Sequence, residues 1–269
     1  VFQLGSLDKK GSSSLVLGSA SSSIDLLSVS EGNLTSSGAD SFQQVTVNGE
    51  GKAASVSLSG KDKIATSLTT NGQNDTITLT GLTADVRRVS NAGKLILQEK
   101  TALTTDSANQ FGQDSQLLIS GASSFNVLSD FDLYNATLDN GTLISTGTLT
   151  LKGAVQSSAS ELSASSIKAN QMVLNQNASL DFSTGVNSVL LTGLFSLETG
   201  SEATITGSLE AQNIEINQDS SLTLTASGSK TSNLGQVTVD GTLSLNGGQT
   251  VRTIEANDIT VNEAGFLSL

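Results

Sequence analysis

The residues of this chain that could do chemistry are its carboxylates, because His and Cys are both absent. Three aspartates, Asp130, Asp132 and Asp139, lie close together in the segment SDFDLYNATLDN (129–140). Acids that converge on one face, usually with an Arg or His beside them, can cleave polysaccharides. Asp130 and Asp132 would share one face of a strand, but no Arg lies nearby, so we interpret all three as solvated acids. Tyr134, the lone tyrosine, could stack on a sugar, although half-buried packing is the usual role of such a residue.

A second candidate is the segment NGQNDTITLTG (71–81), which resembles one degenerate unit of the calcium-binding nonapeptide, with Asn74-Asp75-Thr76-Ile77 in place. That motif supplies Asp side chains and glycine-turn carbonyls as oxygen ligands. Consecutive units must share each ion, and this chain has one unit in which Gln73 replaces the second glycine. We therefore expect an Asn-rich turn. We assign no catalytic, cofactor-binding or metal-ligating residue and expect no cofactor, with calcium as the one ion considered.

Pairs of threonines raise a third candidate, an ice-binding face. That activity needs pairs in register on successive coils of one flat face. We assign the pairs to different columns, so the sequence does not favour it. The pairs are Thr76/Thr78, the adjacent Thr104/Thr105, Thr148/Thr150, Thr204/Thr206 and Thr223/Thr225.

Charge argues against a nucleic-acid partner, and hydropathy argues against a membrane-spanning segment. The chain has 13 basic and 25 acidic residues, a net charge of −12, and no basic run longer than Lys9-Lys10 or Arg87-Arg88. The one other arginine is Arg252. Nucleic acid is excluded as a partner, since phosphate binding needs clustered positive charge. No stretch approaches the ~20 apolar residues of a membrane helix, so we predict no transmembrane segment.

The elements that would position these residues are short strands. Segments such as QVTVNG, SVSLSG, DTITLTG and EATITG place an apolar residue at every second position and end in Gly, Asn, Asp or Ser. That period is typical of a strand with one buried face, and the terminal residues favour turns. No segment shows helical spacing. The absence of Pro also fits continuous ladders, in which every backbone N–H is needed as a donor.

An internal repeat identifies the architecture. Residues 167–182, 209–224 and 254–269 align without a gap, and their apolar residues fall into three columns spaced by about one coil. This predicts an all-β, right-handed parallel β-helix with ~22 residues per coil and little or no helix. At ~4.8 Å per coil, residues 140–269 would form about six coils, a rod of about 29 Å. The predicted columns are Leu174, Phe195, Ile216, Val239 and Val261; Leu180, Ala203, Leu222, Leu245 and Leu267; and Ile167, Leu190, Leu209, Leu234 and Ile254.

A repeated Asn ends the strands of this pattern. Asn175, Asn217 and Asn262 each follow an apolar strand, and Asp240 takes the same place on an intervening coil. Asn and Asp tolerate left-handed backbone angles, which a corner between flat sides would need. Stacked amides at such a corner can also hydrogen-bond along the axis. We interpret the column as structural; a carbohydrate or metal contact is the alternative.

The two halves of the chain differ in regularity. Residues 1–140 alternate without fitting fixed columns, so we expect a less regular β-rich section that forms an N-terminal cap or part of a lattice. Residues 141–269 are expected to be regular solenoid coils. The chain starts at Val1 and closes at Leu269 in mid-repeat, so we expect a leader to have been removed and the coils to continue further or to stack on another subunit.

Three features of the sequence resemble a known group of proteins: the repeated pattern I-x-A-x-x-I-x-[IVL]-N-x-x-x-x-L-x-L, the many Ser, Thr, Asn and Gly residues between the apolar positions, and the absence of cysteine. They are similar to the β-helical passenger regions of type V secreted proteins of Gram-negative bacteria: autotransporter adhesins and two-partner-secretion haemagglutinin-like exoproteins. The resemblance covers residues 140–269 well and 1–140 loosely. Surface-layer proteins and phage fibres have the same kind of sequence pattern. It implies a right-handed parallel β-helix, export across two membranes and adhesion, aggregation or surface coating.

Two functions follow as hypotheses. The first is a non-enzymatic bacterial cell-surface or secreted protein: a stalk, adhesin or surface-lattice subunit, extracellular or associated with the outer membrane. It would self-associate through coil ends or lateral faces and bind glycans or proteins of host or neighbouring cells. The alternative is a carbohydrate-active β-helix that binds or cleaves polysaccharide, with its site in the first half. The absent His, sparse Arg and dispersed acids favour the first.

Overall fold

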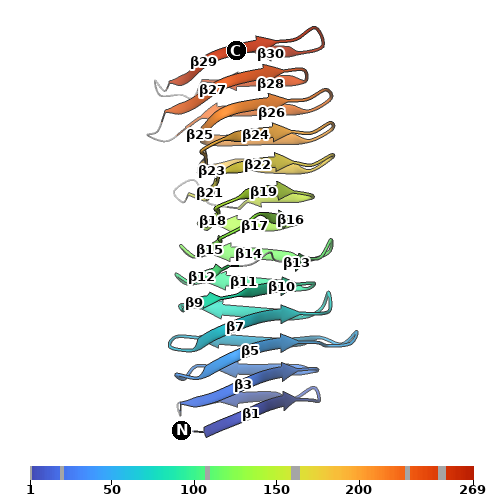
Figure 1. Ribbon diagram of the computed structural model, residues 1–269, viewed down its shortest axis with the longest axis vertical. Coiled ribbons are helices and arrows are strands. Elements are labelled where there is room, and N and C mark those ends of the chain that lie inside the picture. Colours follow the sequence, from blue (N-terminus) through green and yellow to red (C-terminus); the bar gives the residue numbers. More distant parts are fainter. Residues whose placement is uncertain (1, 19–20, 107–109, 159–163, 228–230, 248–252) are drawn as a thin grey trace. The chain divides into compact units, whose positions relative to one another are not determined.

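The computed structural model of the 269-residue chain describes residues 2–18, 21–106, 110–158, 164–227, 231–247 and 253–269. These residues form parallel strands and no helix, which confirms the predicted all-β parallel solenoid. The chain divides into two compact units, Val1–Ser129 and Asp130–Leu269. Within each unit, successive coils lie one upon the next (Figure 1).

The first unit has three parallel ladders. The first is a six-stranded sheet of β1 (Phe2–Lys9), β3 (Ser22–Val29), β5 (Ser41–Val47), β7 (Lys63–Thr70), β10 (Arg88–Asn91) and β13 (Gln110–Phe111). The second contains β2 (Ser14–Leu17), β4 (Gly32–Ser36), β6 (Ala54–Ser59), β8 (Thr76–Thr80), β11 (Lys94–Gln98) and β14 (Gln116–Ser120). The third contains β9 (Thr83–Val86), β12 (Ala102–Thr105) and β15 (Ser124–Val127).

The second unit also has three parallel ladders, which share its longer strands. The first contains β16 (Phe131–Leu133), β19 (Thr148–Leu151), β22 (Gln171–Leu174), β24 (Leu194–Leu197), β25 (Glu202–Ile216), β27 (Ser232–Val239) and β29 (Ile254–Val261). The second contains β17 (Ala136–Asp139), β20 (Ala154–Ser157), β23 (Ser179–Leu191), β25, β26 (Ser221–Ala226), β28 (Thr242–Asn246) and β30 (Phe266–Ser268). The third contains β18 (Thr142–Ser145), β21 (Ser166–Ala169), β23, β25, β27 and β29.

The coil length confirms the sequence estimate of ~22 residues, with a spread. Ile24 pairs with Phe42 on the next coil and Ala154 pairs with Ser179, so a coil takes between 18 and 25 residues. Every second residue of a strand faces inward and is buried, as in the pattern BiBiBi of β6 and iBiBiB of β26. Each inward Leu, Ile, Val or Phe contributes roughly 1.5–3 kcal/mol by leaving water. The stacked interior therefore supplies most of the stability of each unit.

The interior of the first unit contains fixed columns that the sequence did not reveal. One column runs through Leu34, Val56, Ile77, Leu95 and Leu117, and all five side chains are buried. Their separations are 22, 21, 18 and 22 residues, so a search with a constant period loses the column at the short coil.

Two of the predicted interior columns of the second unit are confirmed except for one member each, which is displaced by two residues. Leu174 pairs with Leu197 rather than Phe195, and Leu222 pairs with Leu243 rather than Leu245. A shift of two residues keeps apolar side chains inward, because side chains alternate with a period of two. Alternation alone therefore leaves the two registers indistinguishable.

The third predicted column is wrong at two of its members. Ile167 pairs with Val189, which leaves Leu190 on the outer face with 36% of its surface exposed. Leu234 pairs with Ala211 and belongs to a neighbouring column. Because the segment SVLLTG contains three consecutive apolar residues, its inward face is ambiguous in the sequence.

Candidate functional site

The three aspartates at the start of the second unit lie on its outer surface, and Asp130 and Asp132 have different partners. Asp130 Oδ1 accepts a hydrogen bond from the backbone N–H of Thr148 at 2.8 Å. Asp132 forms an ion pair with Lys152, whose Nζ lies 2.6 Å from Asp132 Oδ2, and this hydrogen bond raises the pKa of Lys152. Asp139 is exposed at the end of β17 and Tyr134 is half-buried. The arrangement is that of acids on a solvated face.

Asp75, the acid of the calcium-like segment, points into a turn of the first unit and is 1% exposed. Its Oδ1 accepts the N–H of Gly49 at 3.0 Å and its Oδ2 accepts the N–H of Gly72 at 2.8 Å. A carboxylate accepts strong hydrogen bonds from backbone N–H groups, so this side chain closes the turn and ties it to the preceding coil. The described residues include no group of three His, Cys, Asp or Glu side chains with the spacing of a metal site.

The three asparagines of the column each begin a turn after a strand, by a geometry different from the predicted one. Asn175, Asn217, Asp240 and Asn262 follow strand ends, and none of them has a positive φ. The left-handed residue lies two positions further on, at Asn177 (φ 61°) and Asp219 (φ 59°). The third residue of a type II turn needs that conformation, and Ala178 and Ser220 close these turns by donating to the carbonyls of Asn175 and Asn217.

The predicted axial hydrogen bond between stacked corner residues is present at one place. Asn262 Nδ2 donates to Asp240 Oδ1 at 2.8 Å across 22 residues of sequence. The backbone N–H groups of both residues donate to the coil before them, to the carbonyls of Val239 and Ile216. Both kinds of bond join successive coils, which supports a structural role for this column.

The threonine pairs are not as scattered as the sequence suggested. Two pairs on β25 and β26 stand in register on adjacent coils, because Thr204 pairs with Thr223 and Thr206 with Thr225. The array is two coils deep, since Asp181 precedes Thr204 in its column and Ser244 follows Thr223. It is too small a lattice match to support ice binding.

The outer surface of the second unit contains a groove of about 300 Å³ beside β18, β21 and β23. Ala169 and the partly exposed Leu190 provide its apolar part. Thr192 Oγ1 donates to Asn170 Oδ1 at 2.9 Å, which fixes the amide and leaves Nδ2 as a donor. The lining residues are Ser145, Thr146, Lys168, Ala169, Asn170, Leu190 and Thr192.

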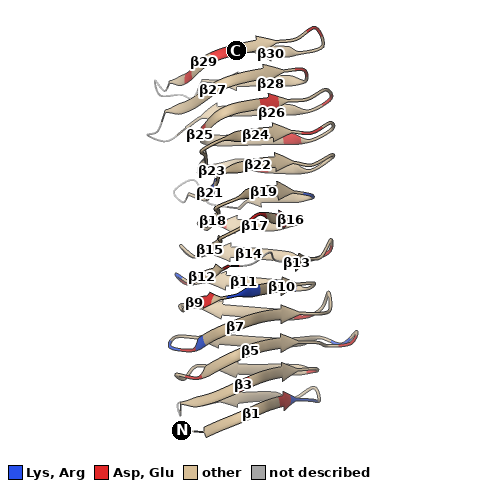
Figure 2. Ribbon diagram, in the orientation of Figure 1, with Lys and Arg blue, Asp and Glu red and all other residues tan. Residues whose placement is uncertain are grey.

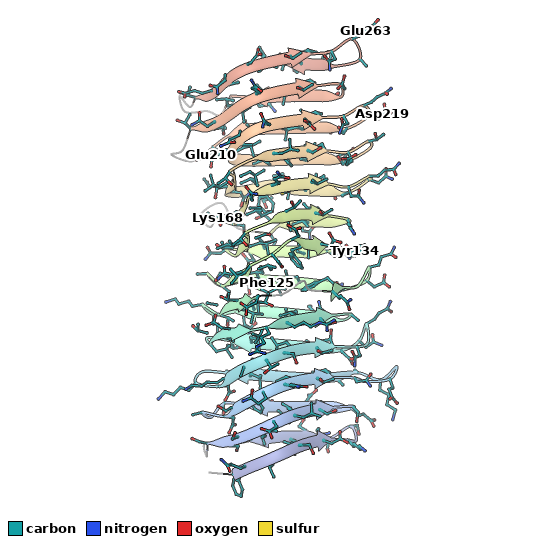
Figure 3. The ribbon with its side chains drawn as sticks, viewed as in Figure 1. Phe125, Tyr134, Lys168, Glu210, Asp219 and Glu263 are labelled. Carbon is teal, nitrogen blue, oxygen red and sulfur yellow. The ribbon has the colours of Figure 1, made fainter. Side chains whose placement is uncertain are left out.

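Lys168 supplies the charge of this groove. In the described residues of the second unit the cations are Lys152, which is paired with Asp132, and Lys168, which is exposed and forms no ion pair. Its column runs through Ile144, Lys168, Leu190 and Glu210 on successive coils. Figure 3 shows Lys168 and Glu210 on one side of this unit and Asp219 on the opposite turn.

The remaining candidates are dispersed. Arg88 Nη2 donates to Gln110 Oε1 at 3.4 Å on the outside of the first unit, and Arg87 is exposed beside it. Arg252 lies outside the described residues. The structure describes no helix, and therefore none long and apolar enough to cross a bilayer in the described part of the chain.

Sequence reasoning missed the groove because it placed Leu190 in the interior. A three-residue apolar run between two Ser/Thr-rich segments was the available signal, since one of the three must face outward. Comparisons with protein-family models, with curated proteins and with solved structures find no match to this chain.

Proposed function

We propose that this chain is a non-enzymatic β-solenoid of a bacterial cell-surface or secreted protein, acting as a stalk, adhesin or surface-lattice subunit. One observation carries the proposal: in each unit the coils stack through continuous apolar columns, while Asp75 and Asp130 accept backbone N–H groups and Asp132 pairs with Lys152. Hydrolysis needs free acids that converge on a substrate. A regular stack instead provides length, at ~4.8 Å per coil.

The extracellular part of this proposal is supported by the sequence resemblance to type V passenger regions. Labelling of intact and permeabilised cells of the source organism with an antibody to the chain tests it. Equal labelling before and after permeabilisation supports a surface location. Labelling that requires permeabilisation contradicts it.

The non-enzymatic part is tested with immobilised polysaccharides. Beads coated with the protein are expected to attach to surfaces coated with the glycans or proteins of a partner cell, and to release no sugar. Soluble reducing ends or unsaturated products from a polysaccharide panel, at a rate that falls when Asp130 and Asp132 are changed to Asn, would favour the carbohydrate-cleaving alternative.

The groove beside Lys168 favours a second function, binding of an uncharged oligosaccharide. A short apolar surface with hydroxyl, amide and ammonium donors around it suits the mixed apolar and polar faces of a sugar. The charge of the unit argues against an anion: residues 130–269 contain 4 Lys and Arg and 14 Asp and Glu, which gives −10. Such an excess repels an anionic chain at long range.

Three single changes test the groove in the full chain, with neutral oligosaccharides of glucose, galactose or N-acetylglucosamine as probes and calorimetry as the measurement. Asn170→Ala and Lys168→Met are each expected to weaken binding about tenfold, which corresponds to one lost hydrogen bond to a charged or amide donor. Lys63→Met is the matched control, because Lys63 is an exposed lysine in β7 of the first unit. An equal loss for Lys63→Met, or no binding by any probe, contradicts this second function.

A further inference from the structure

Two carboxylates are buried against each other in the first unit, where the turns before β5 and β7 stack. Asp40 is 0% exposed and Asp62 is 2% exposed, and they lie on successive coils. Ser36, at the end of β4, is also fully buried and lies between them. Ser36 Oγ is 2.7 Å from Asp40 Oδ2 and 2.9 Å from Asp62 Oδ1.

The backbone supplies a further set of donors to this corner. Asp40 Oδ1 accepts the N–H of Ser22 at 2.6 Å. Asp62 Oδ1 accepts the N–H of Asp40 at 3.1 Å, and Asp62 Oδ2 accepts the N–H of Ser59 at 3.0 Å. Asp62 thus has two backbone donors and Asp40 has one.

The Ser36 hydroxyl has fewer hydrogens than it has short contacts with carboxylate oxygens. Its hydroxyl carries one hydrogen, yet its oxygen lies within hydrogen-bond distance of two carboxylates. If both acids were ionised, one of these contacts would bring two oxygens together without a hydrogen between them. A single proton on the pair removes the conflict: Asp40 Oδ2–H donates to Ser36 Oγ, and Ser36 Oγ–H donates to Asp62 Oδ1.

We propose that Asp40, Ser36 and Asp62 form a buried proton-binding relay, so that the folded first unit retains one proton that the unfolded chain releases. The proton belongs to the pair, since two acids joined through one hydroxyl titrate together.

The surroundings of the relay support a bound proton. Burial raises the pKa of Asp62; hydrogen bonds from Ser59, Ser36 and Asp40 act in the opposite direction, and the negative charge of Asp40 adds to the rise. The charged residues on the flanking turns and strands are all exposed to solvent: Asp25 on β3, Lys61 and Lys63 beside Asp62, and Asp85 on β9. No cation in the described residues forms an ion pair with either buried acid.

The sign of the pH dependence follows from the raised value. The pKa of Asp62 in the folded state lies above its ordinary value of 3.8, so between these two pH values the folded state holds a proton that the unfolded state has released. The stability that this proton adds is fully present below pH 3.8 and is lost as the pH rises through the folded-state pKa. Acidification from neutral pH toward 3.8 should therefore stabilise the first unit, opposite to the usual effect on paired carboxylates.

Asp40→Asn in the full chain tests the relay. The amide keeps the shape of a protonated acid: its oxygen accepts the Ser22 N–H and its Nδ2 donates to Ser36 Oγ. We expect the variant to melt a few degrees higher than the wild type at neutral pH. It should lack the rise in melting temperature that the wild type shows on acidification. A variant that melts lower at neutral pH and keeps the wild-type slope would overturn the proposal.

Asp75→Asn is the matched control. Asp75 is equally buried in the same unit, but both of its carboxylate oxygens accept backbone N–H groups and no hydroxyl is shared. An Asn there must place its NH₂ against one of those donors, so the melting temperature should fall at neutral pH. Equal shifts for the two variants would show a general effect of lowering negative charge and contradict the relay.

A measurement on the wild type decides the matter if Asp40→Asn does not fold. Carboxyl ¹³C resonances of the aspartates, followed from neutral pH down to 3.8, should show that Asp62 and the acid joined to it through Ser36 bind one proton between them. Changing Ser36 to Ala should abolish this shared proton. Two buried carboxylates fully ionised down to 3.8 would overturn the proposal.

Discussion

The two units bury polar groups at their coil corners in different ways. Among the described residues, the buried charged side chains all lie in the first unit: Lys9, Asp40, Asp62 and Asp75. Both units also bury neutral polar side chains, seven in the described part of the first unit and nine in that of the second, where they are the only buried polar groups: Ser145, Ser157, Ser165, Asn187, Ser196, Ser201, Ser208, Ser220 and Ser232. The same coil can therefore close its corners with carboxylates and an ammonium or with hydroxyls.

The two units also differ in net charge, and here the second unit is the more highly charged. Residues 1–129 contain 9 Lys and Arg and 11 Asp and Glu, which gives −2, whereas residues 130–269 reach −10. Figure 2 shows Lys and Arg mainly on the first unit and Asp and Glu on both. The first unit therefore buries charged side chains beneath a nearly neutral surface. The second unit buries neutral polar side chains beneath an acidic surface.

Because of this difference, the two units should respond differently to substitution. A buried charge needs several fixed donors or acceptors, so losing one partner is costly. Lys9 illustrates this, because its Nζ donates to the carbonyls of Lys10 and Glu31 as well as to that of Gly11. A buried serine needs one partner and tolerates replacement better. Apolar columns stabilise both units, but changes at a buried corner should cost more in the first unit than in the second.

The largest expected effect is therefore a charge placed in a column of the second unit. Ile216→Asp puts an unpaired carboxylate between Leu197 and Val239 and should reduce the free energy of unfolding by several kcal/mol. Glu215→Ser, one residue away and exposed, should change it by less than about 0.5 kcal/mol. Chemical denaturation of both variants checks this, and equal losses would contradict the assignment of inner and outer faces.

The next effect compares the two kinds of corner. Asp75→Ala leaves the N–H groups of Gly49 and Gly72 without their acceptor, at roughly 1–3 kcal/mol each. Ser201→Ala removes one hydroxyl that donates to the carbonyl of Glu198 at 2.6 Å, worth about 1 kcal/mol. Denaturant midpoints should fall further for the first variant. The reverse order would remove the distinction between charged and hydroxyl corners.

The smallest effect is expected at the exposed axial hydrogen bond of the second unit. Asn262→Ala removes the contact of Nδ2 with Asp240 Oδ1, which is exposed to water. The change in the free energy of unfolding should stay within about 0.5 kcal/mol. A loss several times larger in thermal melting would show that corner side chains, and not the columns, hold this unit together.

The sequence predicted the fold better than the register. Alternation and the repeat predicted parallel coils of ~22 residues, because period-two burial is a local property. The partners of Leu174 and Leu222 were missed, since shifts of two residues preserve that burial. The role of Asp62 was also beyond the sequence, because its partners Ser36 and Asp40 are 26 and 22 residues away and meet only when coils of unequal length stack.

Amide hydrogen exchange of the full chain, at neutral pH and again just above 3.8, tests the central distinction most directly. After correction for intrinsic exchange rates, the amides of Ser22 and Ser59, which donate to the buried acids, should gain protection on acidification. The amides of Ser201 and Ser220 in the second unit should gain less, because no buried carboxylate accepts from them. An equal gain in both units, or a loss of protection at Ser22 and Ser59, would contradict the account.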